Sequence, residues 1–357
     1  MLPLTINKSV WSSLQHYVLL RHVMLHARRP SKMVVYSERR GITQPMQRAS
    51  VMILACLISF ACKDNPVKFI DNLHYKVAFT YSDSLGETLA TVNQDGTNLR
   101  VVHRLPGTSF FLRWSPNGSK IAFDVYNVQL GVVNTDGTDY KLLANHSSSG
   151  LYGPWYSWFQ DSERMAFSSN DTMSSVNITT GAQDPIGIGA HPMVSPSGDK
   201  IAYVRNSELL VMNPDGTAGT HLADSIEGGL AWSRDGGRIA FVKEGSTLCT
   251  VEQSGIGLLQ LTPRGTAIPR MVSWSPSGNK IAFEWVYGIQ IASSNGSGVA
   301  TLAVNASMPS WHPDGSFIAY IASGGILVLK RPDGSDSARV VPLRVSFSAA
   351  WSPISLP

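Results

Sequence analysis

Residues 114–123 carry the phrase Trp-Ser-Pro-Asn-Gly-Ser-Lys-Ile-Ala-Phe, which decides the fold because it recurs along the chain. A seventh copy is split: it begins at 351–353 as Trp-Ser-Pro, and its missing half, Lys-Val-Ala-Phe, stands at 76–79. A closed ring requires such a split, whereas a linear array does not. The six whole copies are residues 114–123, 158–167, 194–203, 232–241, 274–283 and 311–320.

The spacing of the copies indicates a propeller. Successive Trp-type positions lie 36 to 44 residues apart, and a period near forty residues is typical of a four-stranded blade. One strand ends at the Trp, and a Ser-Pro-x-Gly turn follows because Pro presets its φ and Gly accepts a positive φ. Ile-Ala-Phe then begins a second strand. We therefore predict an all-β fold, a seven-bladed β-propeller of four-stranded blades.

The remaining strands and the ring closure follow from the same units. Asp-Gly turns, as at Asp136 and Asp215, predict a hairpin between the third and fourth strands. The stretch around 346–351 is expected to be the innermost strand of the blade whose other strands come from about residues 75–105, which removes exposed sheet edges. Each repeat Trp is expected to be buried between blades. Val194 and the Trp-Phe-Gln stretch at 158–160 mark the irregular blades.

The repeats resemble those of the TolB-type propeller family, a relative of the WD-repeat proteins, over about residues 75–353. They lack the Gly-His and Trp-Asp marks of eukaryotic WD repeats. The resemblance implies the repeat class only. A close TolB relative would be expected to have a six-bladed ring with an additional N-terminal α/β domain. This chain instead has seven repeat units and only a short linker at 63–74. The propeller domain is expected to span residues 75–357.

The segment 46–62 has the pattern of a bacterial export signal. A basic start precedes an apolar run from Val51 to Ala61, which is too short to span a bilayer, and a small residue precedes Cys62. We predict lipidation of Cys62 and a periplasmic or surface-exposed lipoprotein of the bacterial cell envelope, attached to the membrane only through this anchor. Secretion with cleavage nearby and an uncleaved anchor are the alternatives.

Residues 1–45 fit neither the export signal nor the propeller. We interpret them as a non-native upstream extension or a disordered segment, with translation starting at Met46. Eight basic residues and one acidic residue fall within 1–50. Without this stretch, the net charge of +4 becomes −3. The basic pI therefore does not indicate nucleic-acid binding, and we expect none.

Signals of catalysis are mostly missing from the sequence. It contains no Gly-x-Ser-x-Gly elbow, no His-Glu-x-x-His, no Cys-x-x-Cys and no phosphate-binding glycine loop. We predict no catalytic residues and no cofactor. The alternative is a metal-dependent carbohydrate-active enzyme resembling the oligogalacturonate-lyase-type propellers. It would require His146 and His191 to converge with another His or Gln at about 2–2.3 Å from a metal.

The strongest binding signal is the connection 145–156, which is polar at first and then rich in aromatics. His146, Tyr152 and Trp155 are expected at the channel rim, because Tyr and Trp are enriched where proteins grip partners. Packing of Trp155 and Tyr156 between blades is the alternative. The other expected rim residues are Phe110, His191, Arg264, Arg270, Met308 and Phe347.

A second candidate is the hairpin 284–288, Glu-Trp-Val-Tyr-Gly, expected on the face opposite this rim; packing of Trp285 between blades is its alternative. The mixed aromatic and basic rim would suit a protein segment or an acidic glycan. We expect a non-catalytic, monomeric platform that binds an envelope protein, a peptide segment or a glycan, since a propeller combines a rigid core with variable loops. A structural component of Tol-type envelope machinery is a further alternative.

Overall fold

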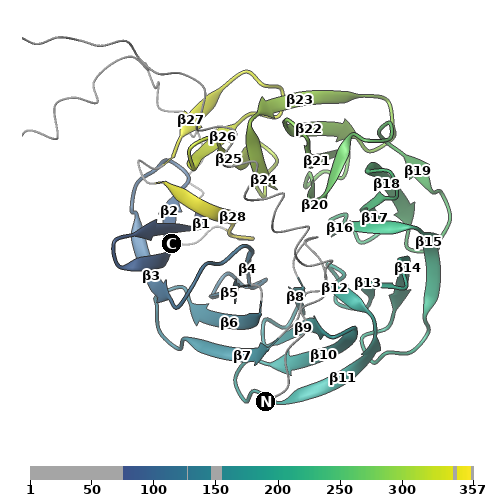
Figure 1. Cartoon of the computed structure of the whole chain (residues 1–357), viewed down its shortest axis with the longest axis horizontal. Helices are drawn as coiled ribbons and strands as arrows, with labels where there is room; N and C mark the ends of the chain where they lie inside the picture. Colours follow the sequence, from purple (N-terminus) through teal and green to yellow (C-terminus); the bar gives the residue numbers. More distant parts are fainter. Residues whose placement is uncertain (1–74, 127, 146–154, 341–343, 355–357) are drawn as a thin grey trace, which may run out of the picture. The chain divides into compact units, whose positions relative to one another are not determined.

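The computed structural model describes residues 75–126, 128–145, 155–340 and 344–354. These residues form seven four-stranded antiparallel sheets arranged radially around a central channel (Figure 1). The described part of the chain is all-β, and the prediction of a seven-bladed propeller is confirmed. No helix long and apolar enough to cross a membrane occurs in it.

The blades are numbered along the chain, and the strands of each blade follow from the innermost outward. Blade 1 contains β28 (Val345–Trp351), β1 (Lys76–Asp83), β2 (Gly86–Asn93) and β3 (Arg100–Leu105); blade 2 contains β4 (Leu112–Trp114), β5 (Lys120–Val125), β6 (Gln129–Asn134) and β7 (Lys141–Asn145); blade 3 contains β8 (Tyr156–Trp158), β9 (Arg164–Ser169), β10 (Thr172–Asn177) and β11 (Gln183–Ile188). Blade 4 contains β12 (Ala190–Val194), β13 (Ile201–Arg205), β14 (Glu208–Met212) and β15 (Thr220–Asp224); blade 5 contains β16 (Ile226–Trp232), β17 (Arg238–Lys243), β18 (Thr247–Glu252) and β19 (Leu259–Gln260). Blade 6 contains β20 (Ala267–Trp274), β21 (Lys280–Trp285), β22 (Gly288–Ser293) and β23 (Val299–Val304); blade 7 contains β24 (Ala306–Trp311), β25 (Ile318–Ala322), β26 (Ile326–Lys330) and β27 (Ser337–Arg339).

The C-terminal strand closes the ring as the split repeat predicts. Strand β28 pairs with β1, and the register places Trp351 opposite Val77. The backbone N–H of Ser352 donates to the carbonyl of Lys76 at 2.8 Å, and the N–H of Lys76 donates to Ser352 Oγ at 3.0 Å. Blade 1 therefore joins strands from both ends of the propeller.

The repeated tryptophans lie between blades, which confirms their expected burial. At each of the six positions the Trp is no more than 9% exposed. In five of them the indole N–H donates to a carbonyl on the innermost strand of a preceding blade; Trp274 Nε1, for example, donates to Ala231 O at 3.0 Å. The other four bonds are Trp114 to Ala350, Trp158 to Arg113, Trp232 to Met193 and Trp351 to Ser310.

The blade-3 turn shows how an irregular repeat keeps the same geometry. Phe159 N–H donates to Arg164 O at 2.9 Å, as Ser115 N–H donates to Lys120 O in the regular turn of blade 2. Ser162, with φ of 60°, stands where blade 2 has Gly118, with φ of 69°. The left-handed backbone that the turn requires is thus retained without glycine.

The two faces of the ring carry different connections. The turns between first and second strands and between third and fourth strands form one face, the turn face. The hairpins between second and third strands, with the links to the next blade, form the other, the connection face. Ala267, at the start of β20, pairs with Trp285, and Asn305 N–H donates to Tyr287 O at 2.7 Å. The hairpin 284–288 therefore lies on the same face as the predicted rim. Its expected position on the opposite face was wrong, because antiparallel strands bring this hairpin back to the end where the chain enters the blade.

Candidate functional site

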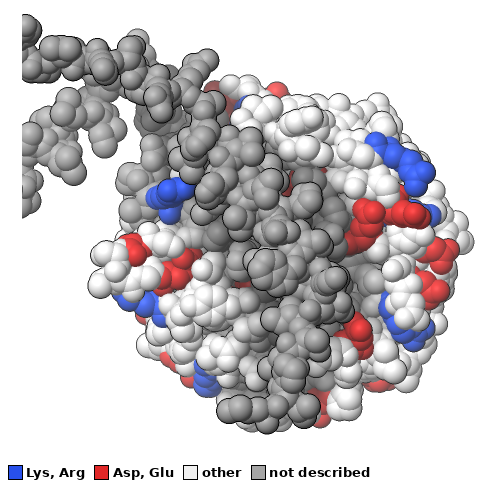
Figure 2. Space-filling model, viewed as in Figure 1, with Lys and Arg blue, Asp and Glu red and all other residues white. Residues whose placement is uncertain are grey.

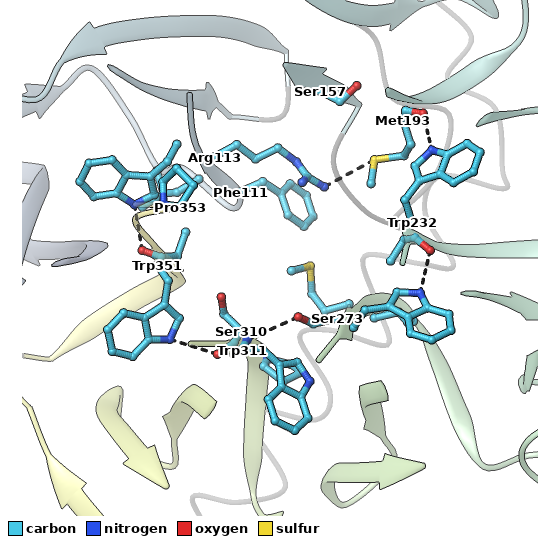
Figure 3. Close-up of a pocket in the computed structure, with 18 of the residues that line it drawn as sticks. Phe111, Arg113, Ser157, Met193, Trp232, Ser273, Ser310, Trp311, Trp351 and Pro353 are labelled. Carbon is cyan, nitrogen blue, oxygen red and sulfur yellow. Dashed lines mark hydrogen bonds between the residues drawn. The ribbon is translucent and has the colours of Figure 1, made fainter. Parts of the chain in front are cut away.

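The central channel contains a cavity of about 460 Å³, to which the innermost strands of all seven blades contribute (Figure 3). Such a volume lies within the ~300–1,000 Å³ range of small-molecule sites. Three residues of the turn face, Arg234, Pro276 and Pro353, also line it. The cavity is thus built from the same strands that carry the repeated Trp residues.

One ring of equivalent positions is central to this lining. It consists of the seven residues that directly precede the repeat Trp, or Val194 in blade 4. Only one of the seven is charged, and the others are small or neutral. The ring residues are Arg113, Ser157, Met193, Ala231, Ser273, Ser310 and Ala350.

Arg113 extends along one side of the cavity toward Met193 of blade 4 (Figure 3). Its Nη2 lies 3.6 Å from Met193 Sδ, a weak acceptor, and its Nε is buried without a hydrogen-bond partner among the described residues. Protein atoms surround the side chain while part of it faces the cavity, and the resulting desolvation lowers the pKa of Arg113. A guanidinium ordinarily stays charged even so.

A second arginine lies at the mouth of the cavity on the turn face. Arg234 is exposed, and its Nη1 donates to Pro313 O at 2.9 Å. This bond reaches from blade 5 past blade 6 to blade 7, so it narrows the mouth on this side.

The described residues that line the cavity include no Asp, Glu, His or Cys. Both of its charged side chains are arginines. The lining therefore offers a positive potential and apolar surface, together with the hydroxyls of Ser273 and Ser310. The Ser157 hydroxyl is already used, since it donates to Pro192 O and accepts from Val194 N–H.

The described members of the predicted rim lie in different environments. Met308 lines the cavity in β24 at a φ of 58°, and its N–H donates to the buried Glu284 Oε1 at 2.6 Å. Phe110 is half-buried just before β4, and Arg264 is exposed in the loop before β20. Arg270 and Phe347 lie in β20 and β28, but their side chains are outside the described residues, as are His146 and Tyr152 entirely.

Trp155 is buried and packs against the half-buried His191 between blades 3 and 4. Their ring centroids are 4.1 Å apart, and Trp155 is 3% exposed. Burial lowers the pKa of His191 to about 4, so this imidazole is neutral at physiological pH. Tyr156 is fully buried as well. These observations favour the packing interpretation for both aromatic residues of this connection.

A metal site of the kind that the lyase alternative requires would need several ligands around His191. In the described part of the chain, the one group of three potential metal-binding side chains is Glu208, His221 and Asp224. It lies on β14 and β15, the outer strands of blade 4, and His221 Nε2 there is paired with Asp224 Oδ1 at 2.9 Å. His191 belongs to no such group of described residues.

Sequence reasoning overlooked the arginines of the cavity and one exposed aromatic residue. Alignment of the seven repeats would have singled out Arg113, since the equivalent positions are otherwise neutral. Tyr126, at the hairpin of blade 2, is 60% exposed, and Tyr287, at the hairpin of blade 6, is 64% exposed. Both hairpins lie on the connection face, where Leu85 is also exposed.

Charged side chains of both signs are interspersed around the periphery of the face in view in Figure 2. Such a mixture lacks the single-sign field that typically attracts nucleic acid. The absence of nucleic-acid binding stays a prediction.

Comparison with known proteins shows the fold alone. No family model matches the sequence, and no curated protein matches it either. A solved oligogalacturonate lyase in complex with manganese is 13% identical, with a TM-score of 0.55, over 69% of this chain and 82% of that one. The oligogalacturonate lyase of Vibrio parahaemolyticus is 11% identical, with a TM-score of 0.54, over 74% and 85% of the two chains.

TolB from Acinetobacter baumannii is also among the similar structures, with 15% identity and a TM-score of 0.49. The match covers 78% of this chain and 66% of that TolB, so this chain spans slightly less than two thirds of its length. The oligogalacturonate lyases, with TM-scores above 0.5, are β-propellers, in agreement with the propeller repeats of the sequence.

Proposed function

We propose that this protein is an exported, lipid-anchored β-propeller of the bacterial envelope that binds another envelope protein or a ligand without catalysing a reaction. The observation that carries the proposal is the cavity in the channel. It is lined by aromatic, apolar and hydroxyl groups and by two arginines, and its described lining has no carboxylate, imidazole or thiol. Such a lining is suited to binding.

The connection face supplies a second argument. Large apolar side chains are exposed at its hairpins: Leu85 is 75% exposed, Val286 is 63% exposed, and Tyr126 and Tyr287 are similarly accessible. Exposed apolar and aromatic groups of this kind are enriched where proteins bind partners. We assign the docking of a protein partner to this face.

Export and anchoring rest on the sequence pattern that ends at Cys62. Metabolic labelling with a radioactive fatty acid tests the anchor in a bacterial host. Label is expected on the wild-type protein and absent from the Cys62→Ser variant. Equal labelling of the two proteins would contradict a lipid anchor at this residue.

Affinity capture from solubilised envelope extract tests the binding role. The wild-type protein is expected to retain one stoichiometric protein, and the double variant Tyr126→Ala, Tyr287→Ala is expected to lose it. Ile256→Ala is the matched control, because Ile256 is 70% exposed in the turn between β18 and β19, on the opposite face. Depolymerisation of an acidic polysaccharide by the metal-loaded protein would overturn the non-catalytic assignment and support the lyase alternative.

A further inference from the structure

Arg113 lines the cavity, and its Nε has no hydrogen-bond partner among the described residues. A guanidinium carries five N–H donors. One of them approaches Met193 Sδ at 3.6 Å, while Nε has no partner among the described residues. Arg113 takes part in none of the ion pairs that described residues form. Arg113 is half-buried, and this Nε is a buried donor. A buried donor without an acceptor is unfavourable for the protein alone, which indicates that the missing acceptor comes from a ligand.

The ionisable groups near Arg113 are already committed to other contacts. The Tyr156 hydroxyl donates to Phe111 O at 2.7 Å, and burial raises its pKa well above the usual value, so it stays neutral. Asp124 Oδ1 accepts the N–H groups of Phe110 at 3.0 Å and Phe111 at 2.7 Å. Neither group forms an ion pair with Arg113.

We propose that Arg113 anchors a carboxylate-binding site in the channel, where a ligand carboxylate forms two parallel hydrogen bonds with the guanidinium. This inference rests on the proposed function, because it specifies the ligand of the same cavity. The planar fork of Arg matches the two oxygens of a carboxylate. Phosphate sites usually gather a nest of backbone N–H groups or a helix N-terminus, whereas this interior ring offers one cation among neutral side chains.

The other lining residues indicate the chemistry of the rest of the ligand. Phe111, Met271 and Met308 supply apolar surface, and Ser273 and Ser310 lie on the side opposite Arg113 (Figure 3). The site therefore fits a compact acid with an apolar body and a polar group at its other end. Either a small organic acid or the C-terminal residue of a peptide carries this chemistry.

Arg234 adds a second positive charge at the mouth on the turn face. Two cations along one channel attract anions from solution, so we expect acid binding to weaken as the salt concentration rises.

Ligand-observed NMR on the purified full-length protein tests the site with defined probes. Phenylpropionate represents a small acid and N-acetylphenylalanine represents a peptide C-terminus, each compared with its uncharged primary amide. Binding of an acid in preference to its amide is expected, and Arg113→Met should weaken that binding by roughly tenfold or more. The acid that binds more tightly identifies the source of the carboxylate.

Three outcomes would overturn the site: equal binding of acids and amides, unchanged acid affinity in Arg113→Met, or tighter binding of inorganic phosphate than of either acid. Arg113→Lys, which keeps the charge but loses the fork, is also expected to bind the acids more weakly. Without a ligand, Arg113→Met should melt no lower than wild type, whereas a purely structural arginine would lower the melting temperature when removed. The defined probes need no protein partner, so failure of this test is distinct from failure of the capture experiment.

Discussion

On the innermost strands, the repeated tryptophans and the residues that directly precede them form two neighbouring rings of opposite character. The tryptophans are nearly uniform and are buried between blades, and five of the six donate to carbonyls of a preceding blade. The preceding ring varies from Ala231 to Arg113 and lines the cavity. Uniform positions therefore hold the blades together, and the variable positions beside them give this propeller its individual interior.

Loss of the closing strand is expected to have the largest effect on the uniform part of the structure. Deletion of residues 345–357 removes β28 with the buried Val345 and Trp351, and it exposes the edge of β1. We expect the free energy of unfolding to fall by more than about 5 kcal/mol. Thermal melts followed by circular dichroism measure the change.

A synthetic peptide of residues 344–354 is the control for this deletion, because it should restore part of the lost stability by pairing with β1. If the truncated protein melts like the intact one, closure by β28 does not hold the ring together.

Substitutions at adjacent positions compare the two rings directly. Trp274→Ala empties a buried site and breaks the bond to Ala231 O, so it should cost roughly 3–5 kcal/mol. Ser273→Ala, one residue earlier, should cost less than about 1 kcal/mol. The Oγ of Ser273 accepts only a long 3.4 Å hydrogen bond from the backbone N–H of Trp311. Urea unfolding measures both. Similar costs at the two positions would remove the distinction between the rings.

Carboxylates extend the comparison to the two faces. On the turn face, hydrogen bonds from Thr138 lower the pKa of Asp136. Hydrogen bonds from the residue two positions later, Thr217 or Ser335, lower the pKa values of Asp215 and Asp333 in the same way. On the connection face, burial raises the pKa of Asp124 to about 6. Repeated turns thus stabilise the ionised acid, whereas this non-repeated site stabilises the protonated one.

Asp124→Asn tests the raised value. Because the folded-state pKa lies above the ordinary 3.8, Asp124 contributes stability that is complete below about pH 4 and is lost as pH rises through about 6. Relative to wild type, the Asn variant should therefore become more stable by up to about 3 kcal/mol between pH 4 and pH 7.5. Urea unfolding at each pH measures this difference. A difference that does not change with pH would contradict the raised pKa.

The fold could be predicted because each repeat contains the residues that specify its own turns. Ser-Pro-x-Gly and Asp-Gly specify local backbone geometry, and the split seventh copy specifies that the ends meet. The face of the hairpin 284–288 was misjudged, since that required following the strand directions through a whole blade.

The candidate site was harder to predict because its residues occupy positions where the repeats disagree. Trp155 packs between blades, rather than pointing to the channel rim, against His191 of the next blade. A single repeat does not show this contact. Arg113 could not be recognised from a local motif for the same reason. It stands out only because the other six blades place neutral residues at the equivalent positions around the cavity.

The smallest expected effect tests one irregularity within the uniform ring. Trp311 Nε1 is buried and has no hydrogen-bond partner among the described residues, whereas Trp274 Nε1 donates to Ala231 O at 3.0 Å. Phe in either place loses similar ring volume, but only Trp274→Phe also breaks a bond and leaves a buried carbonyl without that donor. We expect Trp274→Phe to cost about 1–2 kcal/mol more than Trp311→Phe, as measured by urea unfolding followed in the far ultraviolet.

Trp232→Phe is the matched control for this pair, since its indole N–H donates to Met193 O at 2.8 Å; it should behave like Trp274→Phe. Equal costs for all three variants would mean that Trp311 has an acceptor in solution, which the ring pattern places at the carbonyl of Ser273. In that case the uniform ring of interblade bonds would extend to blade 7, and the contrast with the variable ring beside it would become sharper still.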